Sequence, residues 1–148
     1  MYRSKKEEPE LFLVHPGGPL WKNKDNGAWS IPKGEFTNEE PLTAAIREFG
    51  EETGSSVNGN FIALTPVRSK SGKLIMAWGV EGNIDPDSLR SNTFSLEWPP
   101  KSGKIQLVPE VDKGAWFLPN EAKIKINPAQ IPLINELLMI ITDEKMVE

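Results

Sequence analysis

The 148-residue sequence contains no cysteine and only one histidine, His15. The lack of cysteine excludes disulfide bonds, thiolate zinc sites and a cysteine nucleophile. A Ser-His-Asp triad would have to use His15, which enters the Pro- and Gly-rich run 16–19 and has no catalytic motif around it. The sequence therefore offers no evident group for covalent catalysis.

The sequence also lacks a long apolar run and a strong excess of one charge. No stretch approaches the roughly 18 apolar residues that a membrane span needs, and the N-terminal residues do not resemble a signal peptide. We therefore expect a cytoplasmic protein that makes no membrane contact. With 17 basic and 21 acidic residues, the net charge of −4 does not suggest the basic face of a general nucleic-acid binder.

The length suits one compact domain, and neither repeats nor a linker divide the chain. We therefore expect residues 1–148 to form a single domain. Apolar runs predict strands at 10–15, 29–33, 61–69, 73–80, 105–108 and 115–118, with 61–80 forming a hairpin and 82–104 a long polar excursion. Two further segments, from 119 and from 128 to about 145, are expected to be helices.

The segment 38–54 predicts the principal helix. Asn38 is expected to cap it, Pro41 suits its first turn, and Gly54 is expected to end it in a left-handed conformation. Its predicted buried stripe follows the spacing i, i+3, i+4, i+7, and comprises Leu42, Ala45, Ile46 and Phe49.

Three glutamates, Glu48, Glu51 and Glu52, share one face of that helix. Their negative charges repel one another unless a cation lies between them. Carboxylate oxygens suit Mg²⁺ or Mn²⁺, and these ions commonly hold phosphates and activate water. The cluster therefore predicts a divalent-metal site, rather than the solvated face that a run of charges usually forms.

The spacing from Glu39 through Arg47-Glu48-Phe49-Gly50-Glu51-Glu52-Thr53-Gly54 resembles the signature box of the Nudix hydrolases. Two positions depart from the family pattern, because Gly34 lies one residue too close to Glu39 and Ser55 replaces an aliphatic residue. Glu40 is thus an alternative to Glu39. The resemblance implies an α/β/α sandwich with a mixed β-sheet, metal binding by Glu48, Glu51 and Glu52, and an Arg47 that orients these carboxylates.

Two further likenesses concern diadenosine polyphosphate hydrolases of that family. The segment 29–34, Trp-Ser-Ile-Pro-Lys-Gly, resembles the one that precedes their box, which makes Lys33 a candidate for substrate phosphate. Glu110 stands six residues before Trp116, as a glutamate does in the asymmetric enzymes, where it supplies a further metal ligand or a base. Glu97 and, more weakly, Asp112 are the alternatives.

His15 is a candidate substrate contact because its strand is expected to end near the box, although a lone histidine is more often structural. Among the five tryptophans, Trp98 on the excursion could stack on a base.

These features together predict a metal-dependent hydrolase. It would cleave a phosphoanhydride bond in a nucleoside diphosphate linked to another group, with an NTP or a dinucleoside polyphosphate favoured. A nucleotide-binding regulator without turnover is the alternative, and a metal-binding structural domain explains fewer of the residues. The sequence leaves a homodimer open.

Overall fold

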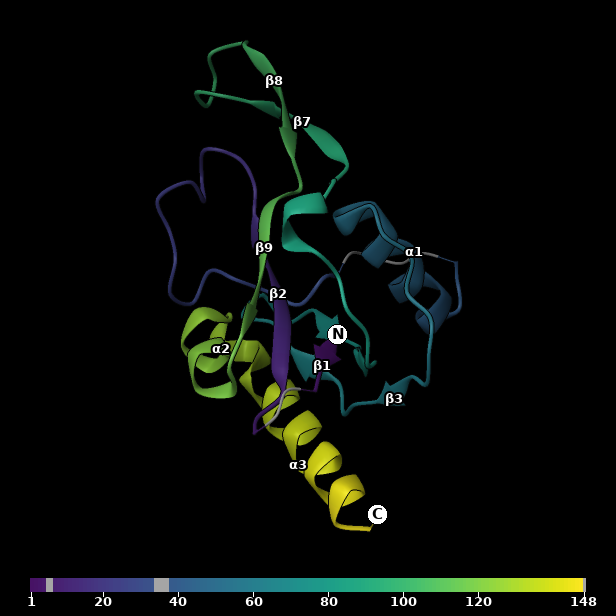
Figure 1. Ribbon diagram of the computed structural model, residues 1–148. Coiled ribbons are helices and arrows are strands. Elements are labelled where there is room, and N and C mark those ends of the chain that lie inside the picture. Colours follow the sequence, from purple (N-terminus) through teal and green to yellow (C-terminus); the bar gives the residue numbers. More distant parts are fainter. Residues whose placement is uncertain (5–6, 34–37, 148) are drawn as a thin grey trace.

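The computed structural model describes residues 1–4, 7–33 and 38–147, and the side chains of 144–147 fall outside the description. Within these residues, short strands and three α-helices follow one another in a mixed order (Figure 1). The elements are β1 (Tyr2–Arg3), β2 (Glu10–Pro16), α1 (Pro41–Thr53), β3 (Ile62–Ala63), β4 (Val67–Arg68), β5 (Leu74–Ile75), β6 (Trp78–Gly79), η1 (Pro86–Ser88), β7 (Thr93–Glu97), β8 (Ile105–Pro109), β9 (Val111–Phe117), α2 (Pro119–Lys125), η2 (Pro128–Gln130) and α3 (Ile131–Val147).

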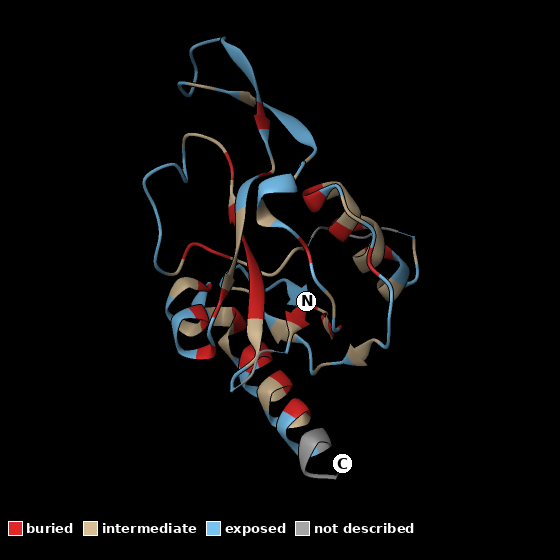
Figure 2. Cartoon of the chain, viewed as in Figure 1, coloured by how far each residue is buried: buried red, intermediate tan, exposed pale blue. Residues whose placement is uncertain are grey.

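Strand β2 is the centre of the fold, paired antiparallel with β1 on one side and β9 on the other. A parallel bridge between Tyr2 and Glu81 joins β1 to the segment that follows β6, so the strand directions are mixed. Five consecutive residues of β2, 11–15, are buried, and this strand is the red band in the middle of Figure 2. The predicted strand at 10–15 is therefore confirmed.

The two faces of β2 pack against different helices. Leu11 and Leu13 lie in one hydrophobic cluster with residues of α2 and α3. Phe12 and Val14 lie in another, which includes Phe49 of α1. Because alternate residues of a strand point to opposite faces, this strand fills the middle layer of the predicted α/β/α sandwich.

The N-cap of helix α1 lies two residues later than expected. Glu40, rather than Asn38, is the N-cap, and its carboxylate accepts hydrogen bonds from the backbone N–H groups of Leu42 at 3.2 Å and Thr43 at 3.0 Å. Pro41 explains the correction, because a residue before proline is held in the extended conformation that an N-cap needs. The predicted end is confirmed, since Gly54 has a φ of 77° and its N–H donates to the carbonyl of Gly50.

The predicted apolar stripe of α1 faces inward. All four of its residues line an apolar cavity of about 100 Å³ between the helix and the strands. Phe49 is the most deeply buried of them, with 7% of its surface exposed.

The segment 61–80 forms the predicted hairpin, although its ladders are short. Strand β4 pairs with β5 near the tip, and β3 pairs with β6 farther out. The predicted strand at 29–33 is reduced to isolated bridges, from Trp29 to Ile126 and from Ser30 to Val14. Pro32 limits this ladder, because proline lacks an N–H to donate.

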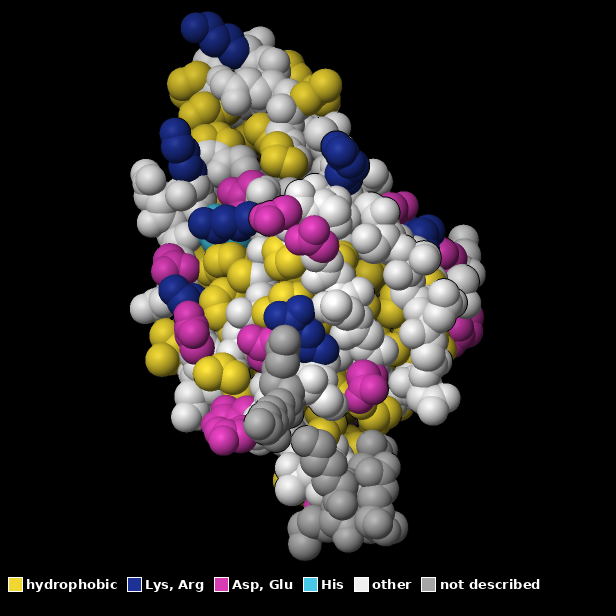
Figure 3. Space-filling view, viewed as in Figure 1, with side chains coloured by type: hydrophobic (Ala, Val, Ile, Leu, Met, Phe, Trp, Pro, Cys, Tyr) yellow, Lys and Arg dark blue, Asp and Glu magenta, His cyan; other side chains and the backbone are white. Residues whose placement is uncertain are grey.

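The predicted excursion is more regular than its polar composition indicated. It contains the 3₁₀ turn η1 and the strand β7, which pairs with β8 in a hairpin that projects from the body (Figure 1). Hydrophobic side chains gather on this hairpin in Figure 3, and Phe94, Ile105 and Leu107 are among the exposed ones. Among the described residues, no helix combines the length and apolar character that crossing a membrane requires.

Candidate active site

Helix α1 presents the acidic cluster on the face formed by positions 41, 45, 48 and 52. Glu48 and Glu52 lie one turn apart on that face, and each is only 8% exposed. Burial, which disfavours the charged form, raises the pKa of Glu48 and raises that of Glu52 to about 8. Two nearly buried carboxylates with raised pKa values are unusual on a helix surface and mark a functional-site candidate.

The backbone of Lys33 holds Glu52 in place. Its N–H donates a 2.6 Å hydrogen bond to Oε2 of Glu52, and both this bond and the charge of Lys33 oppose the rise in the pKa of Glu52. The segment before the box therefore folds back onto the last turn of the helix. The departure noted at Gly34 lies outside the described residues.

Arg47 links the other acidic residues of the box. Its Nε donates to both oxygens of Glu39 at 3.0 Å, and one terminal nitrogen lies 2.9 Å from Glu48 and 3.0 Å from Glu51. These bonds, led by the one to Glu39, raise the pKa of Arg47 further and lower that of Glu39. The arginine thus stays charged and sets the orientation of the carboxylates. Glu39 is therefore the residue that pairs with Arg47, whereas Glu40 is the N-cap of α1.

Glu110 acts on Glu48 and Glu52, although it is distant from both in the sequence. Its charge raises the pKa values of Glu48 and Glu52, so it acts on both across the site. The Asn92 peptide connects Glu110 to α1 through two hydrogen bonds of 2.8 Å. The N–H of Asn92 donates to the carbonyl of Glu51, and the carbonyl of Asn92 accepts from the N–H of Glu110.

The two alternatives to Glu110 lie elsewhere. Glu97 is at the outer end of β7, paired with Ile105 in the projecting hairpin. Asp112 is bonded to Nδ1 of His15 at 2.8 Å. The geometry therefore favours Glu110 as the third acidic group, and its chemical role stays a prediction.

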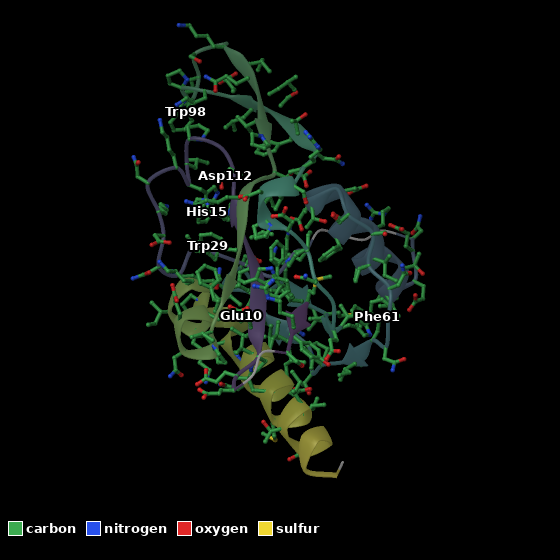
Figure 4. The ribbon with its side chains drawn as sticks, in the orientation of Figure 1. Glu10, His15, Trp29, Phe61, Trp98 and Asp112 are labelled. Carbon is green, nitrogen blue, oxygen red and sulfur yellow. The ribbon has the colours of Figure 1, made fainter. Side chains whose placement is uncertain are left out.

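His15 is almost completely enclosed, with 1% of its surface exposed. Nδ1 contacts Asp112, and Nε2 lies 2.6 Å from the carbonyl of Lys24. The ring centroids of His15 and Trp29 lie 5.3 Å apart in an edge-on arrangement (Figure 4). These contacts fasten the loop that follows β2. Substrate contact by His15 stays a prediction, as does base stacking by Trp98, which lies on the projecting hairpin.

A cleft of about 680 Å³ opens beside Glu48. One side is formed by residues of α1, with Lys33 at the edge, and the other is the β4–β5 hairpin. The hairpin residues were not predicted to line the site, although the basic run 68–73, Arg-Ser-Lys-Ser-Gly-Lys, was a signal for them. The lining residues are Pro32, Lys33, Pro41, Ala44, Ala45, Glu48, Ser69, Ser71, Lys73, Leu74, Ile75 and Met76.

The acidic residues fit a hard divalent cation by their chemistry. In the arrangement observed, the described part of the chain brings no three Asp, Glu or His side chains close enough to form a ready ligand set. However, the charge of Glu110 disfavours the charged forms of Glu48 and Glu52, and a cation between them would relieve that repulsion. These three residues, with Glu51 next to them, are the available oxygen donors.

Comparison with known proteins agrees with this architecture. A family model described as NUDIX domain matches residues 1–137. Among solved structures, the chain resembles that of a C. elegans Ap4A hydrolase binary complex, with a TM-score of 0.63 and 18% identity over 96% of this chain and 93% of the other. Comparison with curated protein sequences gave no match.

Proposed function

The chain belongs to the Nudix hydrolase family, and from this premise we propose that residues 1–148 form one Mg²⁺- or Mn²⁺-dependent domain that hydrolyses a phosphoanhydride bond in a nucleotide. The substrate is a nucleoside diphosphate linked to another group, with an NTP or a dinucleoside polyphosphate favoured. The observation that carries this proposal is the pair of nearly buried carboxylates Glu48 and Glu52, whose pKa values the charge of Glu110 raises, with an open cleft beside Glu48.

Nudix hydrolases generally use divalent metals, and such an ion supplies charge neutralisation at the phosphate and a more acidic bound water. In this protein Glu48, Glu51, Glu52 and Glu110 would hold it. The restraints already present are the N–H of Lys33 on Glu52 and the guanidinium of Arg47 on Glu48 and Glu51. These restraints reduce the movement that the carboxylates must make in order to bind the cation.

Hydrolysis then proceeds as a direct displacement. Water forms a bond to phosphorus while the bond from phosphorus to the bridging oxygen breaks, and that oxygen leaves with the second phosphate. A glutamate, with Glu110 the best placed outside the helix, accepts the proton of the water. The described residues show no triad that would favour a covalent intermediate, because both ring nitrogens of His15 are engaged by Asp112 and Lys24.

A panel of nucleotides, assayed with Mg²⁺ or Mn²⁺ and resolved by chromatography, tests the proposal. An NTP should give NMP and pyrophosphate, and a dinucleoside polyphosphate should give two nucleotides. In ¹⁸O-water under single turnover, one labelled atom should appear on a product phosphate. Tight nucleotide binding without turnover would favour a regulator on the same fold, and label on a sugar oxygen would exclude the mechanism.

A further inference from the structure

The ladder between β2 and β9 contains one extra residue on β9. His15 lies opposite Lys113. The next residue of β2, Pro16, lies opposite Val111. Asp112 is therefore passed over in the pairing with β2, which is the arrangement of a β-bulge. Because bulges re-aim nearby side chains and are over-represented next to active sites, this one has a bearing on the residues around it.

The bulge decides which side chain of β9 enters the core. Phe12 and Val14 of β2 lie in the hydrophobic cluster on the α1 side, and Val111 joins that cluster with 3% of its surface exposed. A regular ladder would put Asp112 opposite Pro16 and so on the same apolar face, because directly opposed residues share a face. The extra residue thus gives the apolar position to Val111 and spares a carboxylate from burial there.

The carboxylate of Asp112 bonds instead to His15 (Figure 4). Its Oδ1 lies 2.8 Å from Nδ1 of His15, and the ring nitrogen is the donor because a carboxylate only accepts. The imidazole is itself held, with Nε2 at 2.6 Å from the carbonyl of Lys24 and the ring edge-on to Trp29. A buried ring that is engaged at both nitrogens is a rigid anchor for the bulged residue.

The residue before the bulged pair is Glu110, and the bulged register fixes its backbone. The N–H of Gly17 donates to the carbonyl of Glu110 at 3.0 Å, and the N–H of Glu110 donates to the carbonyl of Asn92. A Cβ at Gly17 would collide with the carbonyl oxygen of Pro109, so only glycine fits against this turn. In a regular ladder Gly17 would lie opposite Val111, and its bond to Glu110 would be lost.

We propose that His15 and Asp112 are positioning residues, which hold the β2–β9 bulge in register and thereby fix Glu110 for the reaction. The proposal rests on the proposed function and deepens it, because it names what places the third acidic group. A slip of one residue moves a strand by about 3.3 Å. A misplacement of about 1 Å already costs an enzyme on the order of 10²-fold in rate. His15 in this role acts through Glu110 and does not touch the substrate.

Two amide substitutions of His15 separate its two contacts. Asparagine places an N–H donor near the position of Nδ1, and glutamine places one near that of Nε2. His15→Asn should therefore keep the bond to Asp112, whereas His15→Gln should keep only the bond to Lys24. With the nucleotide that the wild type turns over fastest, His15→Gln should lower kcat by about tenfold to a hundredfold, and His15→Asn should recover most of this loss. KM should change by less than about threefold, whereas loss of a substrate contact would raise it.

Asp112 gives the same test from a more exposed position, since 34% of its side chain is accessible and its replacement leaves the core intact. Asp112→Ala should reproduce the loss in His15→Gln. Asp112→Asn, whose amide oxygen still accepts from the ring, should reproduce His15→Asn. Wild-type kcat in a folded Asp112→Ala would overturn the inference.

A double-mutant cycle with Glu110→Gln shows whether the pair acts through Glu110. Adding His15→Gln to Glu110→Gln should lower kcat by less than about twofold further, because the group that it displaces is already inactive. Losses that multiply in the double variant would show a histidine that only supports the fold, and would contradict a positioning role.

Backbone hydrogen exchange provides a measurement that needs no turnover. The N–H groups of Gly17 and Glu110 should exchange at least about tenfold faster in His15→Gln than in His15→Asn, while that of Phe12, bonded to the carbonyl of Met1, serves as the unchanged control. Turnover by the wild type with the same kcat in His15→Gln refutes the inference alone. Faster exchange at Gly17 and Glu110 without turnover of any nucleotide supports the placement of Glu110 by this pair and refutes the proposed function.

Discussion

The backbone N–H of Lys33 donates a 2.6 Å hydrogen bond to Oε2 of Glu52, across 19 residues of sequence. This bond ties the end of the segment 29–33 to the last turn of α1. It orients a carboxylate that is otherwise nearly removed from water, and it places the Lys33 side chain at the edge of the cleft. The bond therefore couples the candidate phosphate contact Lys33 to the proposed metal ligand Glu52.

Turnover should require a divalent cation, because burial and the charge of Glu110 oppose the ionisation of Glu48 and Glu52. We expect exhaustive EDTA treatment to abolish hydrolysis and added Mg²⁺ to restore it. Cation binding should also raise the unfolding midpoint of the wild type, because a ligand that binds the folded state stabilises it. Full activity in the chelated sample would contradict the metal hypothesis.

Glu52→Gln should lower kcat on the order of 10³-fold, because it removes a proposed ligand and its contribution to the transition state. The fold should persist, since glutamine keeps the shape of the side chain and its amide oxygen can still accept the bond from Lys33. A variant with kcat near the wild-type value would remove Glu52 from the site.

The same variant has a pH signature in EDTA. Burial raises the pKa of Glu52 from its ordinary 4.5 to about 8, so the folded protein binds this proton more tightly than the unfolded chain does. The stabilisation is complete below about pH 4.5 and is lost as the pH rises to about 8. Urea midpoints of the wild type should therefore fall over this range more steeply than those of Glu52→Gln. Parallel pH profiles would contradict the raised pKa.

Glu110→Gln should reduce kcat more than Glu97→Gln, because Glu110 acts on the box carboxylates and Glu97 lies on the projecting hairpin. Loss of a general base typically costs about 10²- to 10⁴-fold. Both changes remove one negative charge, so each controls for the other in single-turnover assays. The reverse order would move the base, or the extra ligand, onto the hairpin.

Gly50→Ala should stabilise the protein by roughly 0.5–1 kcal/mol, because alanine is the better helix former. An added Cβ would meet only the carbonyl of Ser55, at an ordinary 3.7 Å. Gly54→Ala is the matched contrast, since its φ is +77° and its Cβ would lie 2.9 Å from Arg90 atoms. Urea unfolding should therefore move in opposite directions for the two variants, and a less stable Gly50→Ala would show that α1 is packed more tightly there than described.

Local chemistry made much of α1 predictable. Its inward stripe and its glycine stop follow from side-chain spacing and from the conformational freedom of Gly54, so both could be read from residues close in sequence. The cap was misplaced because Asn38 and Glu40 can both accept from helix N–H groups, and only the constraint from Pro41 decides between them. The strand β7 was missed because Thr93, Ser95 and Glu97 alternate with its apolar residues and the segment appears polar as a whole.

The rest of the site depends on contacts between distant segments. Nothing local to Lys73 indicates that the hairpin comes to lie across a cleft from Glu48, and the choice of Glu110 over Glu97 depends on how Asn92 is bonded. The enclosure of His15 likewise follows from Asp112, which is 97 residues away. Such arrangements are set by tertiary packing, which composition and periodicity do not encode in any single segment.

The two hydrogen bonds of the Asn92 peptide anchor the root of the β7–β8 hairpin to α1. Because the anchor lies at the root, a reporter peptide grafted beyond about residues 97 and 105 should leave the acidic side chain of Glu110 in place. The fold thereby separates the outer hairpin, which can be altered, from Glu110 at its root, which is proposed to act in the reaction.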